Sequence, residues 1–167
     1  THFIDGWLDP SCRDLKSEVK YENAHTCSSR MIGSFVSWLQ DQGFYENTTV
    51  VIVGDHLGMQ TDFYTSQIPE GYERTVYNAY INAPIEPIRE KNRVISAFDT
   101  FPTTIASIGG KIEDDRLGFG TNLFSQRDTL AEQIGIETIN AETKKRSEYY
   151  QTCIIDADNC NEKRLPQ

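Results

Sequence analysis

The chain has 167 residues, of which 38% are hydrophobic, 11% aromatic and 25% charged, and its formal net charge is −9 at pH 7. This length suits one domain with a substantial core, and the aromatic content excludes a disordered polyelectrolyte. The negative charge argues against a nucleic-acid binder, and no apolar run reaches the roughly 20 residues of a membrane-spanning helix.

The first half of the chain alternates between expected helices and strands. Residues 1–4 resemble the end of a strand, and residues 5–20 form a polar loop. Residues 21–42 have apolar side chains at helical spacing, and Gly43 follows as a stop signal. Residues 48–53 are a β-branched run without polar alternation, which is typical of a central parallel strand buried on both faces.

The second half continues this alternation. A strand is predicted at residues 76–83, a short strand or lead-in at residues 94–97, and a helix at residues 100–108. Residues 116–124 are an extended segment interrupted by glycines, and a terminal helix is predicted at residues 141–151. The pattern predicts an α/β fold in which helices sandwich a largely parallel sheet.

The most informative residues follow the β-branched run, which ends in Gly54-Asp55-His56. Ligands of open α/β sheets bind beyond the carboxyl ends of strands, and carboxylate and imidazole groups both bind Mn²⁺ or Zn²⁺. Asp55 and His56 are therefore candidate metal ligands; the alternative is a turn aspartate beside a surface histidine. His2 would reach the same edge if its strand is a neighbour, where it would bind a phosphate or sulfate oxygen. Its alternative is a terminal residue without a role.

Four cysteines allow three disulfide pairings, and none has the CxxC spacing of a zinc or redox motif. Cys153 and Cys160 bracket a polar stretch, in which a small disulfide loop fits if the compartment is oxidising.

His25 lies within the expected helix and is interpreted as structural.

Four short sequence blocks occur one after another within the first 130 residues. They are Thr-His-Phe at residues 1–3 with Asp5-Gly6, residues 44–56 up to Gly-Asp-His, residues 98–104 (FDTFPTT) and residues 116–124 (RLGFGTNLF). Together they resemble the alkaline phosphatase–sulfatase superfamily, and more closely its lipoteichoic acid synthase and phosphoglycerol transferase branch. The resemblance implies an incomplete alkaline-phosphatase-like domain at residues 1–130, followed by a polar extension at residues 131–167.

The resemblance also implies a mechanism. A threonine activated by a divalent metal, manganese in this family with Mg²⁺ or Zn²⁺ as alternatives, attacks a phosphatidylglycerol-type donor, and the phosphoglycerol passes to a glycerol-phosphate polymer. Asp55 and His56 match the family's metal ligands, and His2 matches the histidine that contacts the phosphoglycerol. The family's threonine and glutamate ligand precede the block of His2. We therefore expect them upstream, together with membrane helices, and expect the isolated chain to be inactive.

Further expectations follow from the same resemblance. The family works outside the cytoplasm, and we expect the parent protein to be anchored in the bacterial cell membrane. Because disulfides persist there and Cys153 and Cys160 enclose only six residues, we predict this pair and make no prediction for Cys12 and Cys27. We expect loss of the amino-terminal half of the domain, its natural partner, to favour self-association through an exposed apolar strand edge or face.

Two other functions remain as alternatives: a sulfatase or phosphodiesterase of the same superfamily, and a non-enzymatic secreted module with the same fold. Cys27-Ser28-Ser29-Arg30 is similar to the Cys-x-Pro-x-Arg signature of formylglycine sulfatases. We reject it as a catalytic motif because it lacks the proline, its arginine is one residue too close, and it lies within the expected helix.

Overall fold

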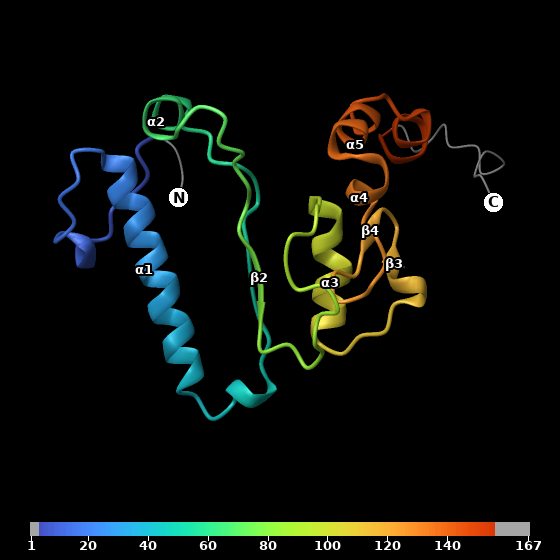
Figure 1. Ribbon diagram of the computed structural model, residues 1–167, viewed down its shortest axis with the longest axis horizontal. Helices are drawn as coiled ribbons and strands as arrows, with labels where there is room; N and C mark the ends of the chain where they lie inside the picture. The colour runs from blue at the N-terminus through green and yellow to red at the C-terminus, as the bar shows by residue number, and fades with distance from the viewer. Residues whose placement is uncertain (1–3, 156–167) are drawn as a thin grey trace. The chain divides into compact units, whose positions relative to one another are not determined.

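The computed structural model describes residues 4–155, and the chain divides into two compact units (Figure 1). Unit 1 comprises Thr1–Glu86 and Thr104–Lys111, and unit 2 comprises Pro87–Thr103 and Ile112–Gln167. The candidate metal ligands belong to unit 1. Among the described residues, no helix combines the length and the apolar composition that crossing a bilayer requires.

Helix α1, Lys20–Gln40, confirms the helix predicted at residues 21–42. Tyr21, Ala24 and Cys27 recur at three-residue intervals and form a buried stripe on its first two turns. Four large apolar side chains further along the helix are exposed: Met31, Ile32, Phe35 and Trp38. The periodicity that predicts the helix is therefore real, but much of its apolar stripe is uncovered.

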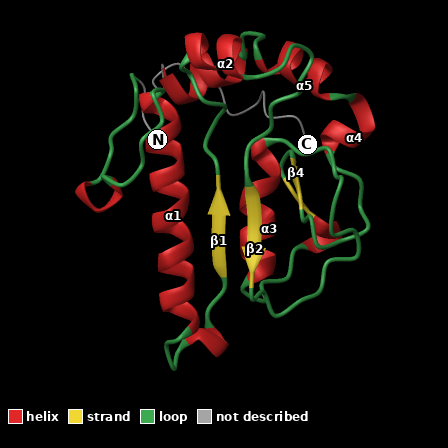
Figure 2. Ribbon diagram, turned by 60° about the vertical axis from the view of Figure 1, so that its left-hand side comes forward, coloured by secondary structure: helices red, strands yellow, loops and turns green. Residues whose placement is uncertain are grey.

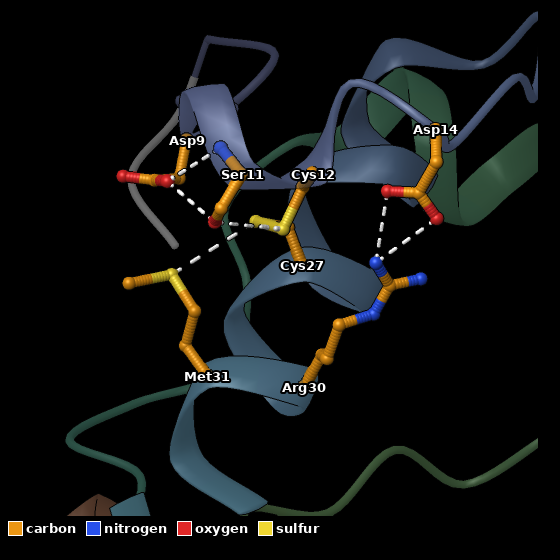
Figure 3. Close-up of a disulfide and its surroundings, with 7 residues drawn as sticks. All are labelled: Asp9, Ser11, Cys12, Asp14, Cys27, Arg30 and Met31. Carbon is orange, nitrogen blue, oxygen red and sulfur yellow. Dashed lines mark hydrogen bonds and ion pairs between the residues drawn. A yellow bond between two sulfur atoms is a disulfide. The ribbon is translucent and has the colours of Figure 1, made fainter. Parts of the chain in front are cut away.

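A disulfide joins Cys12, in the 3-10 turn Pro10–Cys12, to Cys27 of α1, with the two Cα atoms 5.7 Å apart (Figure 3). The sequence made no prediction for this pair. A second bridge lies beside it, because Arg30 Nη1 donates to both carboxylate oxygens of Asp14 at 2.9 and 3.0 Å. Both bridges hold the polar loop that precedes α1 against the helix.

Strands β1 and β2 form the sheet that leads to the candidate metal ligands. β1, Val50–Val53, pairs with β2, Asn78–Ile81, in antiparallel register. The α/β class is confirmed, but the parallel direction predicted for this sheet is wrong. The reason is the position of α2, Thr61–Gln67, which lies beyond the carboxyl end of β1 rather than across the sheet (Figure 2). The chain therefore returns from the same end of the sheet, whereas a parallel pair needs a crossover.

Unit 2 is organised around the fully buried Asp99. One carboxylate oxygen accepts from the Ser96 backbone N–H and the other from the Thr121 N–H, both at 2.8 Å. At Gly120 an added Cβ would lie 1.9 Å from the Phe98 carbonyl oxygen, so only glycine fits there. The segments at residues 98–104 and 116–124 thus pack against each other through Asp99 and Gly120.

The short elements of unit 2 follow from these contacts. Of the two possibilities for residues 94–97, a short strand or a lead-in, the structure shows the lead-in, because the capping box of Ser96 and Asp99 starts a 3-10 turn there. The extended segment predicted at residues 116–124 is a small antiparallel hairpin. The elements are the 3-10 turn Ala97–Asp99, helix α3 (Thr100–Ser107, shared with unit 1), a 3-10 turn at Glu113–Asp115, β3 (Arg116–Leu117), β4 (Gly120–Thr121), α4 (Leu130–Ile134) and α5 (Ile136–Thr143).

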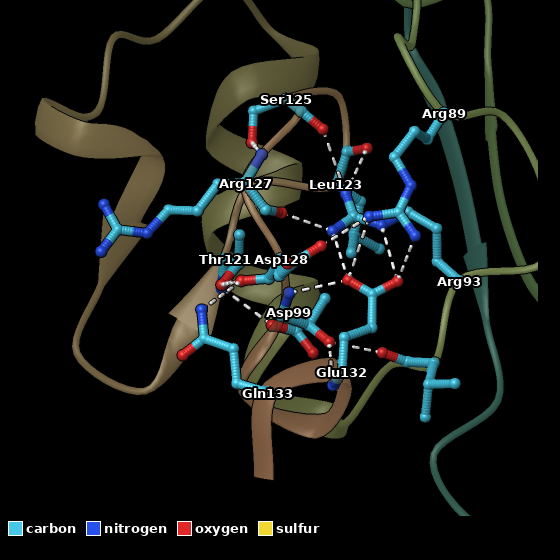
Figure 4. Close-up of polar contacts among 12 residues, drawn as sticks. Arg89, Arg93, Asp99, Thr121, Leu123, Ser125, Arg127, Asp128, Glu132 and Gln133 are labelled. Carbon is cyan, nitrogen blue, oxygen red and sulfur yellow. Dashed lines mark hydrogen bonds and ion pairs between the residues drawn. The ribbon is translucent and has the colours of Figure 1, made fainter. Parts of the chain in front are cut away.

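An ion-pair network holds α4 to the segment that precedes Asp99 (Figure 4). Arg93 Nη2 and Glu132 Oε2 are 2.8 Å apart, and both side chains are largely buried. Glu132 also accepts from the Thr129 backbone N–H at 2.8 Å, as part of a capping box. Burial alone would raise the pKa of Glu132. The hydrogen bonds from Arg93 and Thr129 and the charges of Arg93 and Arg89 outweigh burial and lower that pKa to about 2.

The end of the described chain differs from the single helix predicted at residues 141–151. α5 stops at Thr143, and a separate π-helical turn covers Tyr150–Ile155. The division predicted between residues 130 and 131 stays a prediction.

Candidate functional site

Gly54-Asp55-His56 lies at the carboxyl end of β1, where the sequence pattern places it. The Gly54 N–H donates to the Tyr77 carbonyl at 2.8 Å, which extends the β1–β2 pairing by one bond. An added Cβ at Gly54 would lie 3.2 Å from Val76 Cβ, so a side chain there would crowd the neighbouring strand. Asp55 and His56 are thus the first residues free of the sheet.

The two side chains are arranged as a pair. Asp55 Oδ2 and His56 Nε2 are 3.5 Å apart, and the Asp55 and His56 side chains are 89% and 59% exposed. Asp55 Oδ1 accepts from the His56 backbone N–H at 3.0 Å. His56 Nδ1 lies 2.8 Å from the Leu57 carbonyl oxygen. Because a carbonyl oxygen can only accept, Nδ1 carries a proton, and in the neutral ring the lone pair is then on Nε2, the nitrogen on the side of the Asp55 carboxylate.

This geometry fits two ligands of a shared divalent cation. Two ligand atoms about 2.1 Å from one ion, at octahedral or tetrahedral angles, lie about 3.0–3.4 Å apart. The observed 3.5 Å is close to that range, and the hydrogen bond from Nδ1 to a carbonyl is the support that metal-bound histidines commonly have. No cluster of three or more metal-ligating His, Cys, Asp or Glu side chains occurs within residues 4–155. The described chain therefore supplies a ligand pair rather than a full coordination sphere.

The loop that follows the pair rests on Tyr64 and Arg74. Arg74 Nη1 donates to the Gly58 carbonyl at 3.0 Å, and the guanidinium carbon lies 4.1 Å from the centre of the Tyr64 ring. A cavity of about 480 Å³ opens beside this contact, and its polar lining includes Thr61, Tyr64, Thr65, Glu70, Tyr72 and Arg74. Sequence reasoning missed Tyr64 and Arg74, because a stacking contact across a long loop leaves no periodic signal.

An aromatic cluster lies beneath this loop. The Tyr21 ring packs edge-on against Phe63 and Tyr64, at centroid distances of 5.1 and 6.2 Å. Burial, together with the neighbouring Tyr64 hydroxyl, raises the pKa of Tyr21 to about 12. The His25 ring packs edge-on against Tyr21 at 4.4 Å, and burial lowers its pKa. His25 is exposed on α1 and packs against Tyr21, which agrees with its interpretation as a structural residue.

Three residues that the sequence singles out have different outcomes. His2 and Cys160 lie outside the described residues, so the phosphate-binding role of His2 and the Cys153–Cys160 disulfide stay predictions. Cys27 is buried and bonded to Cys12, which agrees with the rejection of the Cys27-Ser28-Ser29-Arg30 motif as catalytic.

A match to a known protein-family model identifies the family of this chain. Residues 13–110, more than half of the chain, match the family model described as Sulfatase. The chain belongs to the sulfatase family. The matched span includes α1, β1, β2 and the Asp55–His56 pair, so the candidate ligands lie within the sulfatase domain. The resemblance seen in the sequence blocks is thereby confirmed.

Curated relatives in this family point to its phosphoglycerol transferase branch. Phosphoglycerol transferase I of Xanthomonas campestris pv. campestris (strain B100) is 27% identical over 130 residues, which cover 75% of this chain and 18% of the relative. Lipoteichoic acid synthase-like YvgJ of Bacillus subtilis (strain 168) is 26% identical over 120 residues, 72% of this chain and 16% of the relative. The chain thus spans less than a fifth of these sulfatase-family proteins, which fits the predicted incomplete domain. No solved structure matches the chain significantly.

Proposed function

We propose that this chain supplies the Asp55–His56 ligand pair to the metal centre of an extracytoplasmic phosphoglycerol transferase. The observation that carries the proposal is the 3.5 Å approach of Asp55 Oδ2 to His56 Nε2, with Nδ1 held by the Leu57 carbonyl. The names of the relatives, phosphoglycerol transferase I and lipoteichoic acid synthase-like, favour transfer over sulfate-ester hydrolysis. We propose a phosphatidylglycerol-type donor, a glycerol-phosphate polymer acceptor and a parent protein anchored in the cell membrane.

The chemistry follows from the charges at the site. A divalent cation, Mn²⁺ by family resemblance with Mg²⁺ or Zn²⁺ as alternatives, lowers the pKa of an attacking hydroxyl and neutralises charge on the phosphoryl oxygens. Asp55 contributes a full negative charge, and His56 contributes a neutral nitrogen whose tautomer is fixed by the Leu57 carbonyl. We propose that the nucleophilic threonine and the glutamate ligand come from residues outside this chain.

Cation binding by the isolated chain tests the ligand pair. With two protein ligands, most of the coordination is left to water, and we expect a dissociation constant for Mn²⁺ of roughly 10⁻⁶ to 10⁻³ M. Asp55→Ala removes this binding, whereas Glu46→Gln, which removes an exposed carboxylate elsewhere in unit 1, leaves it unchanged. Calorimetry that finds nanomolar affinity unaffected by Asp55→Ala contradicts the assignment.

Turnover tests the reaction. The isolated chain should neither transfer phosphoglycerol nor cleave phosphodiester or sulfate-ester substrates. In the longest natural protein that contains this sequence, Asp55→Ala and His56→Ala should each lower diacylglycerol release from phosphatidylglycerol by about 100-fold or more, with Glu46→Gln as control. Metal-dependent sulfate-ester hydrolysis in place of lipid turnover would show that the sulfatase alternative is correct.

A further inference from the structure

The loop that carries the candidate metal ligands makes few contacts through the ligands themselves. The Asp55 and His56 side chains contact each other and the adjacent backbone, and both are mostly exposed. Their orientation must therefore be set by whatever holds the backbone that follows them.

That backbone is held at Gly58. Its carbonyl oxygen accepts from Arg74 Nη1 at 3.0 Å, and its Cα is so close to Tyr64 that an added Cβ would lie 1.8 Å from the Tyr64 hydroxyl. Two side chains from outside the loop thus meet one residue of it, and the close approach requires a glycine there.

Arg74 is itself fixed in place. Its guanidinium lies over the Tyr64 ring at 4.1 Å, within the range of a favourable cation–π contact. Tyr64 packs in turn against Tyr21 of α1, which is 1% exposed. The contacts at Gly58 are therefore continuous with the core of unit 1.

We propose that Arg74 is a positioning residue for the metal-ligand pair. By holding the Gly58 carbonyl, Arg74 fixes the Gly58–Met59 peptide. Together with the close approach of Tyr64 to Gly58, this restrains the preceding Leu57–Gly58 peptide, whose carbonyl oxygen lies 2.8 Å from His56 Nδ1. That hydrogen bond leaves the lone pair of the neutral His56 ring on Nε2, on the side of Asp55. This inference rests on the proposed function, because it concerns the same candidate metal site.

If Arg74 acted only through its charge, its removal would change the Mn²⁺ affinity in the opposite direction. A positive charge near a cation site repels the cation, so removal of that charge alone should strengthen Mn²⁺ binding. Loss of positioning should weaken it, even though the repulsive charge has gone. The direction of the change in Mn²⁺ affinity therefore separates the two roles.

The experiment compares four forms of the 167-residue chain: wild type, Arg74→Gln, Arg74→Lys and Arg30→Gln. Arg30 pairs with Asp14 on the surface of the same unit, so Arg30→Gln is matched in charge but does not touch the loop. Each form is titrated with Mn²⁺ by electron paramagnetic resonance. Without metal, at about pH 8 where histidine is neutral, long-range ¹H–¹⁵N spectra show which ring nitrogen of His56 is protonated.

We expect Arg74→Gln to weaken Mn²⁺ binding about tenfold and to convert the single Nδ1–H tautomer of His56 into a mixture. Arg74→Lys should have the same effects, since a lysine ammonium lacks the planar fork that stacks on Tyr64 while it donates to Gly58. Arg30→Gln should change neither quantity. Thermal unfolding shows whether each form is folded. If Arg74→Gln does not fold, the His56 spectrum of Arg74→Lys tests the positioning role instead.

Different results would overturn the positioning role and the proposed function. Unchanged or tighter Mn²⁺ binding by folded Arg74→Gln, with His56 still in one tautomer, overturns the positioning role. A mixture of tautomers in the wild type overturns it as well. Absence of Asp55-dependent Mn²⁺ binding in the wild type overturns the proposed function instead, and the His56 spectra then still report whether Arg74 orients that ring.

Discussion

Asp5 and Gln60 are joined by two reciprocal hydrogen bonds although 55 positions separate them in the sequence. The Asp5 N–H donates to Gln60 Oε1 at 2.6 Å, and Gln60 Nε2 donates to Asp5 Oδ1 at 2.9 Å. Asp5 has a φ of 61°, in the left-handed region that aspartate tolerates better than most residues. The pairing brings the segment after His2 beside the segment after His56. It supports the hypothesis that both blocks serve one site.

Gln60→Glu tests this pairing. The substitution removes the amide donor and places a second carboxylate against Asp5, so we expect the free energy of unfolding to fall by about 1–2 kcal/mol at pH 7. Urea denaturation measures the change. Gln67→Glu is the control, because Gln67 is exposed on α2 and its amide donates to the adjacent Ser66. Equal stability of the two variants would contradict a structural role for the Asp5–Gln60 pair.

The fold could be predicted from the sequence where the pattern is local. The periodicity of α1, the β-branched run of β1 and the proline-led start of α3 each identify an element from its own residues. The direction of the β1–β2 pairing could not be predicted, because it depends on where α2 lies beyond the sheet. The capping of Ser96 by Asp99 also overrides the extended appearance of the residues around it.

The residues of the candidate site also differ in whether the sequence alone predicts them. Asp55 and His56 could be predicted because a β-branched run that ends in polar ligand residues is a local signal, although β1 is only partly buried rather than buried on both faces as predicted. Arg74 and Tyr64 could not, because their contacts with Gly58 cross 16 and 6 positions of irregular chain and depend on tertiary packing. Side chains that bear the chemistry are thus visible in the sequence, and those that hold them are not.

The two bridges between the 9–14 loop and α1 should differ in strength. The Cys12–Cys27 disulfide separates its cysteines by 15 positions, and loss of such a bridge costs about 3 kcal/mol. The Asp14–Arg30 pair is exposed and screened by solvent, and such pairs contribute little to stability. We therefore expect a Cys12→Ser/Cys27→Ser variant to lose far more stability in urea than Arg30→Gln. Similar losses in the two variants would show that the disulfide is not the main support.

Glu132 should make the stability of unit 2 depend on pH. Its pKa is lowered to about 2 in the folded chain, so its contribution is fully present above the unfolded value of about 4.3 and is lost as the pH falls towards 2. At pH 7 we expect Glu132→Gln to cost about 2 kcal/mol. Denaturation between pH 7 and pH 2.5 should show this difference shrinking below about pH 4.5.

A matched control for Glu132 is Glu142→Gln. Glu142 pairs with Lys145 on the surface of the same unit and is 57% exposed. Its variant should differ little from the wild type at any pH in that interval. A constant difference between wild type and Glu132→Gln across the interval would contradict the lowered pKa.

Self-association is expected through the uncovered stripe of α1 rather than through a strand edge. Phe35 and Trp38 are 56% and 52% exposed and stack on each other at a centroid distance of 5.8 Å. Contiguous apolar surface of this kind favours contact between copies of the chain, even at a net charge of −9. We expect light scattering to show a dimer or higher oligomer at high concentration, and Phe35→Glu to shift it towards monomer.

Ser37→Glu adds the same charge to α1 but lies on the opposite side of the helix from that stripe, so it should leave the oligomer intact. A wild-type chain that is monomeric at high concentration and melts in one sharp transition would show that the stripe needs no cover, and would favour a self-sufficient module over part of a larger domain.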